Sequence, residues 1–306
     1  MEIFNRYSQK METEHTPCAK WLNFLYKTIF GRILLHLFFK RAIFSRCIGF
    51  FMNRSNSKKR IVPFCKTYHI DLSQFEKNPE DYTSFNDFFC RKLKSGSRTI
   101  NIDEHSACFP ADGRHLGFQN IDTLQNFFIK GSKFNLETLL GDRVLAEYFQ
   151  GGSCVISRLA PVDYHRFHFP CSGIPQECRP IKGFLKSVHP LALARSLKIF
   201  GDNKRCVTLL ESDVFGKVAL LEVGATCVGS IQQTYLPKQP VIAGEEKGYF
   251  AFGGSTLITL FQYKRITLAE DLLHLSQQGI ELYAHMGDFM GKQEETHESK
   301  EVAFVN

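Results

Sequence analysis

Two glycines stand directly before a serine in residues 250–261, which read FAFGGSTLITLF. Because Gly253 and Gly254 have no Cβ, the backbone there can take conformations that other residues avoid. That freedom would let the hydroxyl of Ser255 fold back onto the preceding carbonyl, which is the geometry of an N-to-O acyl shift. Taken alone, Gly-Gly-Ser-Thr is more often a turn that leads into a strand.

A second stretch, residues 158–170, contains His165 and His168. An activated serine needs a base that titrates near neutral pH, and histidine is the usual choice. In a strand, the two side chains would face opposite sides, so they are poor joint ligands for one metal ion. One of them could face a cavity, although a single histidine in such a strand is more often structural.

The third stretch is FPADGR at residues 109–114. Here Asp112 could orient and support a histidine, as the third member of a catalytic triad does. Pro-Ala-Asp-Gly is also an ordinary turn sequence. Each of the three stretches is therefore a weak signal by itself.

Together and in this order, the stretches resemble the phosphatidylserine decarboxylase family. The resemblance runs from about residue 83 to the carboxyl end without large gaps. Five motifs carry it: SFNDFFCRKLKSGSR at 84–98, PADG at 110–113, LAPVDYHRFH at 159–168, EVGATCVGSI at 222–231 and GEEKGYFAFGGST at 244–256. The last of these is similar to the family's processing site, where Leu-Gly-Ser-Thr or Gly-Gly-Ser-Thr is found.

The resemblance implies a proenzyme that cuts itself between Gly254 and Ser255. His168, supported by Asp112, would deprotonate Ser255, whose oxygen attacks the Gly254 carbonyl. Elimination of the resulting ester and loss of ammonia would leave a covalent pyruvoyl group, the only cofactor expected. The products would be a large chain, 1–254, and a small chain, 255–306.

The activity implied by the same resemblance is conversion of phosphatidylserine to phosphatidylethanolamine with release of CO2, a step of phospholipid biosynthesis. The pyruvoyl carbonyl would form a Schiff base with the substrate amine and accept the electrons left by the departing CO2. His165 or His168 would return a proton to the α-carbon, and the sequence does not decide between them. The family also suggests a homodimer.

The elements that must position these residues follow from composition. After Gly96, short runs rich in β-branched and aromatic residues alternate with Gly, Pro and Asp, as in antiparallel β domains. They predict strands at 154–159, 164–169, 206–211, 218–223, 226–232 and 257–261, with 218–223 central because it is nearly continuously apolar. Residues 61–93 look helical, with a helix cap at Ser84. We expect an α+β protein with a mostly antiparallel catalytic β core at 81–306 and an amino-terminal helical, membrane-associating layer at 1–80.

The amino-terminal region is basic and aromatic. Residues 15–70 contain 11 lysines and arginines, among them Lys40, Arg41 and Arg46, and no acidic residue. No run there without a formal charge exceeds seven residues, against the ~20 apolar residues that a membrane span requires. Phe-rich helices with many cations can lie in a membrane interface, at anionic headgroups. We therefore expect a peripheral protein on the cytoplasmic side of the cell membrane, with an anionic phospholipid surface as partner and no nucleic acid.

Ten cysteines could form a disulfide framework, but the first residues match neither a secretory signal nor a transit peptide. No two cysteines have the two-to-four-residue spacer of zinc ribbons, so the sequence predicts reduced thiols and no metal ion.

Two other functions stay open at this point. One is a Ser-His-Asp hydrolase that uses Ser255 without cutting the chain, although the Gly-x-Ser-x-Gly pattern is missing around it. The other is a membrane-binding protein on an inactive decarboxylase scaffold, which the joint presence of Asp112, His168 and Ser255 argues against.

Overall fold

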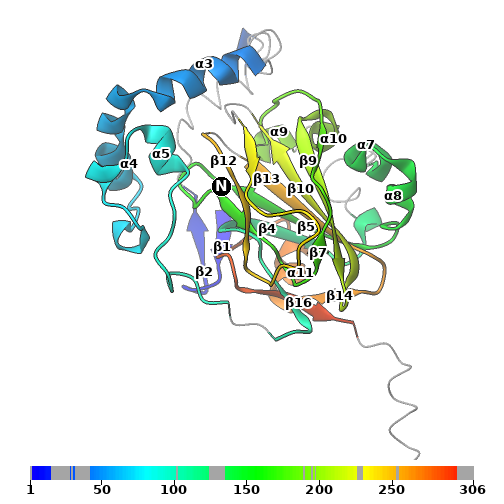
Figure 1. The fold of residues 1–306 in the computed structure, drawn as a ribbon. Coiled ribbons are helices and arrows are strands. Elements are labelled where there is room, and N and C mark those ends of the chain that lie inside the picture. The colour runs from blue at the N-terminus through cyan, green and yellow to red at the C-terminus, as the bar shows by residue number, and fades with distance from the viewer. Residues whose placement is uncertain are drawn as a thin grey trace, which may run out of the picture.

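The computed structural model describes residues 2–14, 28, 30–31, 42–100, 103–123, 135–188, 190–193, 196, 198–225, 230–252 and 255–294. In these ranges the chain has an α+β fold with one large and two small sheets (Figure 1). Every strand pair but one is antiparallel, so the predicted class is confirmed for this part of the chain; the exception joins β1 (Glu2–Asn5) to β15 (Glu281–Ala284).

The large sheet holds the predicted serine in its middle. Its path is β2-β1-β15-β4-β5-β13-β10-β9-β7, and β8 also pairs with β9. The other strands of this sheet are β2 (Lys10–Thr13), β4 (Gly113–Phe118), β5 (Ser153–Leu159), β7 (Ile174–Pro175), β8 (Arg179–Ile181), β9 (Arg205–Ser212), β10 (Gly216–Gly224) and β13 (Ser255–Phe261). The strands predicted at 154–159, 206–211, 218–223 and 257–261 are confirmed.

Strand β13 is covered on both faces, which explains its apolar sequence. All seven of its residues are buried. Successive side chains of a strand point to opposite faces; Leu260 belongs to one hydrophobic cluster and Phe261 to another. A strand enclosed in this way reads as a continuous apolar run rather than an alternating one.

Two three-stranded sheets complete the β structure. One has the order β11-β12-β6, with β11 (Ile231–Gln233), β12 (Glu246–Phe250) and β6 (Arg166–His168). The other has the order β14-β16-β3, with β14 (Ile266–Leu268), β16 (Phe289–Gln293) and β3 (Ser106–Cys108). The strand predicted at 164–169 is thus shorter than expected. Of the strand predicted at 226–232, residues 226–229 lie outside the described residues, and β11 begins at Ile231.

Helices between residues 42 and 89 pack on one another at one side of the sheets (Figure 1). Ser84 begins α5 as predicted, since its side chain accepts a hydrogen bond of 3.1 Å from the backbone N–H of Asp87. The elements here are α3 (Ala42–Asn53), the 3-10 helix η2 (Ser55–Arg60), α4 (Ile61–Thr67), η3 (Leu72–Gln74), η4 (Pro79–Asp81) and α5 (Phe85–Phe89). No helix of the described residues has both the length and the apolar character needed to cross a membrane.

The remaining helices are short connections. They are η5 (Ile121–Thr123), α7 (Leu136–Leu140), α8 (Arg143–Glu147), α9 (Pro190–Leu193), α10 (Lys198–Asp202) and α11 (Glu270–Gln277).

The start of the chain differs from the expected helical layer. Residues 2–13 form a β-hairpin whose first strand lies parallel to β15, with Ile3 opposite Glu281. Only Ile3 among these strand residues is buried, and β2 is exposed along its whole length. The polar sequence fits this position at the edge of the sheet, and the hairpin belongs to the large sheet. The domain boundary expected at residue 80 stays a prediction.

A buried carboxylate fastens this hairpin to the core. Glu14 follows β2, and its two oxygens lie 2.9 Å from Arg114 Nε and 3.0 Å from Arg158 Nη2. Arg158 also donates to Glu281 at 2.9 Å, and Arg114 pairs with Asp163. All five side chains are buried, so water screens their charges only weakly. Each buried charge is therefore stabilised by its oppositely charged neighbours.

Replacement of Glu14 by alanine should therefore lower the free energy of unfolding by about 3 kcal/mol, since two buried guanidinium groups lose an anionic partner. Denaturant titration measures this directly. Glu2→Ala, at an exposed position of the same hairpin, is the control and should change the free energy by less than ~0.5 kcal/mol. Equal effects of the two substitutions would show that the Glu14 network does not anchor the hairpin.

Candidate active site

Ser255 is the first residue of β13, between two long strands. Its backbone is opposite Leu159 on β5 and Gly224 on β10. The side chain is fully buried, and within the described residues its Oγ has no hydrogen-bond partner. An unsatisfied buried hydroxyl costs free energy, so such a group in a folded protein calls for an explanation, of which a catalytic role is one. Gly253 and Gly254, and with them the predicted scissile carbonyl, lie outside the described residues.

His168 ends β6 and is held by a backbone carbonyl. Its Nδ1 lies 2.9 Å from the oxygen of Gly244. A carbonyl oxygen can only accept, so Nδ1 carries the proton and Nε2 of the neutral ring carries the lone pair. Tyr164 Oη is 3.3 Å from this Nε2. The arrangement presents Nε2 as the basic atom of His168.

Burial keeps His168 ready to accept a proton. Removal from water lowers the pKa of its imidazole, while the Gly244 carbonyl and the carboxylates of Glu246 and Asp112 act in the opposite direction. The net shift is downward, so the ring is neutral at pH 7. A neutral imidazole is the protonation state that general-base catalysis requires.

His165 lies beside the segment that leads to Ser255. Its Nδ1 is 2.9 Å from the oxygen of Asp163, which again leaves Nε2 as the basic atom. Its own carbonyl accepts a 3.0 Å hydrogen bond from Phe250 N, five residues before Ser255. The ring packs on Phe89 with 3.9 Å between centroids. Both predicted histidines therefore present the same nitrogen.

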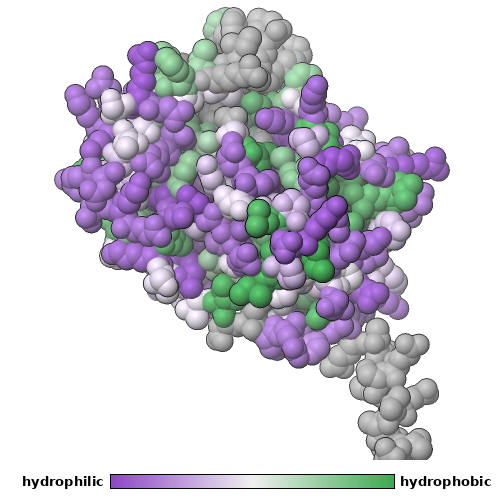
Figure 2. Space-filling view, viewed as in Figure 1, coloured by the Kyte–Doolittle hydropathy of each residue, from purple (hydrophilic) through white to green (hydrophobic). Residues whose placement is uncertain are grey.

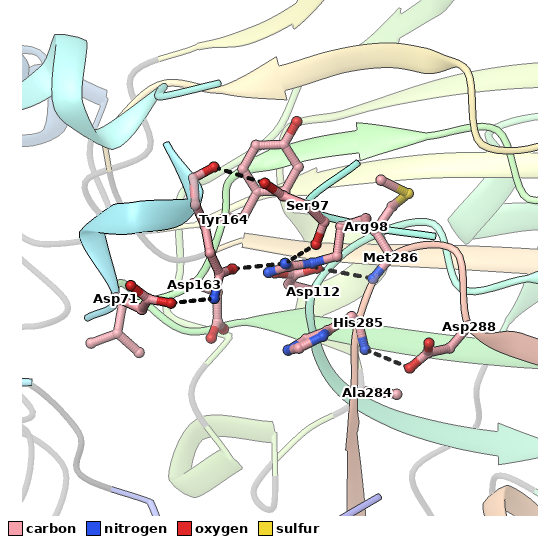
Figure 3. A network of polar contacts seen from close by, with 12 residues as sticks. Asp71, Ser97, Arg98, Asp112, Asp163, Tyr164, Ala284, His285, Met286 and Asp288 are labelled. Atoms are coloured by element: carbon pink, nitrogen blue, oxygen red, sulfur yellow. Dashed lines mark hydrogen bonds and ion pairs between the residues drawn. The ribbon is translucent and has the colours of Figure 1, made fainter. Parts of the chain in front are cut away.

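Asp112 directly precedes β4 and is buried. Figure 3 shows it beside Arg98 and Met286. Arg98 binds both carboxylate oxygens, with Nε 3.0 Å from Oδ1, and the backbone N–H of Met286 donates to Oδ1 at 2.9 Å. Burial opposes ionisation, but the hydrogen bonds and charge of Arg98 hold the pKa of Asp112 below its usual range. Asp112 is therefore a buried anion at neutral pH.

Asp112 influences His168 through its charge and not through a hydrogen bond in the described part of the chain. Within the described residues no hydrogen bond joins the two side chains, because Arg98 and Met286 occupy the carboxylate and Gly244 occupies Nδ1 of the histidine. Asp112 acts on His168 through its charge, which raises the pKa of the imidazole. The carboxylate acts in the same way on His285, which follows β15 (Figure 3).

Several residues at the site carried no separate signal in the sequence. Arg98 is one cation at the end of the first motif, and only the fold shows that it neutralises Asp112. Asp163 accepts the backbone N–H of Ala160 at 2.6 Å and so closes the turn before His165. Arg91 donates to the Asp163 carbonyl at 2.7 Å from the helical side of the molecule. Turn chemistry at Asp163 was the one clue available beforehand.

A small cavity of about 10 Å³ lies between β13 and the sheet that carries His168, which is room for about one water molecule. Its polar lining comes from His168 and from a buried ion pair, in which Lys247 Nζ is 2.8 Å from Glu222 Oε1. Leu257 of β13 contributes to the apolar part. Strand β13 and His168 thus border the same internal space.

The chain matches the family model described as "Phosphatidylserine decarboxylase" over residues 85–292. It is also similar to several curated proteins named "Phosphatidylserine decarboxylase proenzyme". The protein of Chlamydia trachomatis serovar D is 45% identical over 292 residues, covering 95% of this chain and 97% of the relative. That of Fusobacterium nucleatum is 41% identical over 293 residues, covering 96% and 98%. That of Clostridium perfringens is 42% identical over 291 residues, covering 95% and 99%.

Proposed function

The chain belongs to the phosphatidylserine decarboxylase family, an enzyme family, and we propose that it removes the serine carboxyl group of phosphatidylserine to give phosphatidylethanolamine and CO2. The observation that carries the proposal is Ser255, a buried hydroxyl without a partner in the described chain, at the processing motif and on the central strand. The proenzyme names of the relatives support processing of the chain.

Self-cleavage needs only groups of the chain itself and one water. A histidine Nε2, which we assign to His168, takes the proton of Ser255 Oγ, and the oxygen attacks the Gly254 carbonyl carbon. As the C–N bond breaks, the imidazolium returns this proton to the leaving nitrogen, which gives an ester and a free amine. Loss of the α-proton of residue 255 then breaks its Cβ–O bond, and the Gly254 carboxylate leaves. Water hydrolyses the remaining dehydroalanine and releases ammonia. The serine is thereby converted to an amino-terminal pyruvoyl group.

The surroundings of Ser255 fit such a group. A pyruvoyl group is small and uncharged, and it would replace a buried side chain that has no hydrogen bond to lose within the described residues. When present, it supplies a ketone carbonyl that reacts with the substrate amine and accepts the electron pair left by CO2. His165, whose Nε2 is the atom that can carry a proton in and out, is our candidate to protonate the α-carbon afterwards.

The two chains produced would stay together. Residues 255–261 pair with β5 on one side and with β10 on the other, seven residues each. Strands β14, β15 and β16 and helix α11 also belong to the small chain, and β15 pairs with β1 and β4 of the large chain. Cleavage would therefore convert one chain into an interwoven pair. We further propose that this pair associates as a homodimer, which sedimentation of the processed protein can test.

We assign membrane contact to the end of α3 and to η2. Phe50 and Phe51 are 57% and 59% exposed, and the guanidinium of Arg54 lies 4.5 Å from the Phe50 ring centroid. Three exposed cations follow at residues 58–60. Figure 2 shows hydrophobic and hydrophilic residues side by side over this helix. This mixture suits peripheral binding to anionic phospholipid on the cytoplasmic side of the cell membrane. Lys40 and Arg41 lie outside the described residues, as does the Arg46 side chain.

Changing Phe50 and Phe51 together to serine should weaken binding to phosphatidylserine-containing vesicles at least tenfold, because two aromatic side chains no longer leave water on binding. Vesicle co-sedimentation measures the change. Val144→Ser, at a 65%-exposed position on α8, is the control and should leave binding unchanged. Equal sedimentation of all three proteins would remove the membrane contact from the proposal.

The activity itself is tested with purified, processed protein and vesicles that contain phosphatidylserine. We expect equal amounts of CO2 and phosphatidylethanolamine. Folded and processed protein that forms neither product would overturn the proposed activity while leaving self-cleavage intact. An uncut chain that reacts with serine-directed inhibitors would instead favour the hydrolase alternative.

A further inference from the structure

Two cysteines and a glutamate from three strand segments meet at the β8 side of the large sheet. The Sγ atoms of Cys178 and Cys206 and a carboxylate oxygen of Glu222 all lie within 4.8 Å of one another. Cys206 is directly opposite Glu222 in the β9–β10 pair, and Cys178 immediately precedes β8. The sequence separations of 28 and 16 residues match no zinc motif, so only strand pairing reveals the group.

We propose that these three side chains form a site for one divalent transition-metal ion of the zinc type. Two thiolates and one carboxylate are ligands that Zn²⁺ takes in proteins, with a water molecule completing a tetrahedron. Tetrahedral Zn–S bonds of 2.3 Å place two sulfur atoms about 3.8 Å apart. The described ligand atoms already lie within 4.8 Å of one another, which is compatible with this value.

Strand geometry favours a metal ion over a disulfide between Cys178 and Cys206. Arg179 is opposite Val207 and Pro180 is opposite Cys206, so continuing the register places Cys178 opposite Thr208. The two cysteines are then diagonal neighbours, whose Cα atoms are typically ~7–8 Å apart in an antiparallel pair. A disulfide usually needs a Cα separation of about 4.4–6.8 Å. A metal ion bridges the wider gap without moving the strands.

The charges around the ligands suit a dication. Two thiolates and the Glu222 carboxylate would carry three negative charges, and Lys247 contributes one positive charge at 2.8 Å from Glu222. A divalent ion brings the sum of these charges to zero, and a buried site favours this neutrality.

Partners are also in place to orient the carboxylate. Lys247 donates to one oxygen of Glu222 and Gln233 donates to the other, each at 2.8 Å. Lys247 in turn donates to Gln233 Oε1 at 2.8 Å. Carboxylates that bind metals are commonly oriented by such outer hydrogen bonds, which also affect the affinity of the site for the metal.

The position of the group indicates a structural role. All three ligands belong to the proposed large chain, so the site would form before cleavage and persist after it. It would join β8, β9 and β10. Strand β10 pairs with every residue of β13. A metal ion here would stabilise the strands on the β10 side of Ser255.

The test uses the full-length protein purified under reducing conditions. We expect about one zinc ion per chain by elemental analysis, and Co²⁺ should give intense thiolate-to-metal absorption bands. Cys178→Ser should roughly halve these bands, and Cys206→Ser and Glu222→Gln should each lower Co²⁺ affinity at least tenfold. Cys47→Ser, an exposed cysteine on α3, is the matched control and should retain full binding.

Two results would overturn the proposal. One is metal-free wild-type protein that shows no thiolate–Co²⁺ absorption although circular dichroism confirms folding. The other is a protein in which two thiols cannot be titrated until reductant is added, whether or not metal is present. That result would identify a disulfide instead. Because Cys178 is only half-buried, Cys178→Ser should fold even if Cys206→Ser does not, and it keeps the test decisive. None of these readouts depends on decarboxylase activity.

Discussion

Ser255→Ala should leave the protein as one uncut chain of 306 residues without decarboxylase activity. The substitution removes the only oxygen that can attack the Gly254 carbonyl in the proposed reaction, so neither the cut nor the pyruvoyl group can form. Intact mass spectrometry should show the wild type as residues 1–254 and a blocked fragment of 52 residues (306 − 254). The fold should tolerate the change, since the hydroxyl has no hydrogen bond to lose within the described residues.

Ser153→Ala is the matched control for this result. Ser153 is equally buried, at the opposite end of the strand that pairs with β13, and its hydroxyl donates to Gln119. It should be cut normally and lose about 1 kcal/mol of stability with its hydrogen bond. A Ser255→Ala protein that still divides after Gly254, or folded wild type that never divides, would contradict self-cleavage at this serine.

The second large effect should separate the two histidines. His168→Ala should slow self-cleavage by about 10²–10⁴-fold, the usual contribution of a general base, and so accumulate the uncut chain. His165→Ala should still be cut, but its processed form should release CO2 about 10²–10⁴-fold more slowly, because proton return to the α-carbon fails. Mass spectrometry and CO2 release measure the two steps independently.

His274→Ala provides the control, because His274 lies on α11 and bonds only to Gln278 in the described part of the chain. It should be processed and active. Exchange of the two phenotypes would assign the base to His165 and the proton donor to His168. Normal cleavage and normal activity in both variants would remove both histidines from the mechanism.

The strands around Ser255 were predictable because local sequence determines them. Residues 218–223 and 257–261 form apolar runs between turn residues, and both are enclosed strands. The cap at Ser84 was predictable for the same reason, since its hydroxyl bonds to a backbone group three residues away. Short-range chemistry of this kind does not depend on the rest of the fold.

Features that depend on distant pairing were not predictable. The hairpin at 2–13 exists because β15, almost 280 residues later, offers it a sheet edge. The role of Arg98 depends on the placement of Asp112 and Met286, which lie 174 residues apart in the sequence. The grouping of Cys178 with Cys206 depends on the register of β8. In each case the residues in contact are close in space but far apart in the sequence, so no local pattern predicts the contact.

The placement of β13 inside the large sheet would make the proposed maturation a one-way event. After cleavage, the small chain can leave only if the pairs with β5 and β10 separate, which amounts to opening the core. The uncut precursor would refold as a single molecule, whereas a cleaved protein, once unfolded, would have to reassemble from two molecules at a rate that depends on concentration. The mature enzyme would therefore persist through the height of its unfolding barrier rather than through reversible refolding.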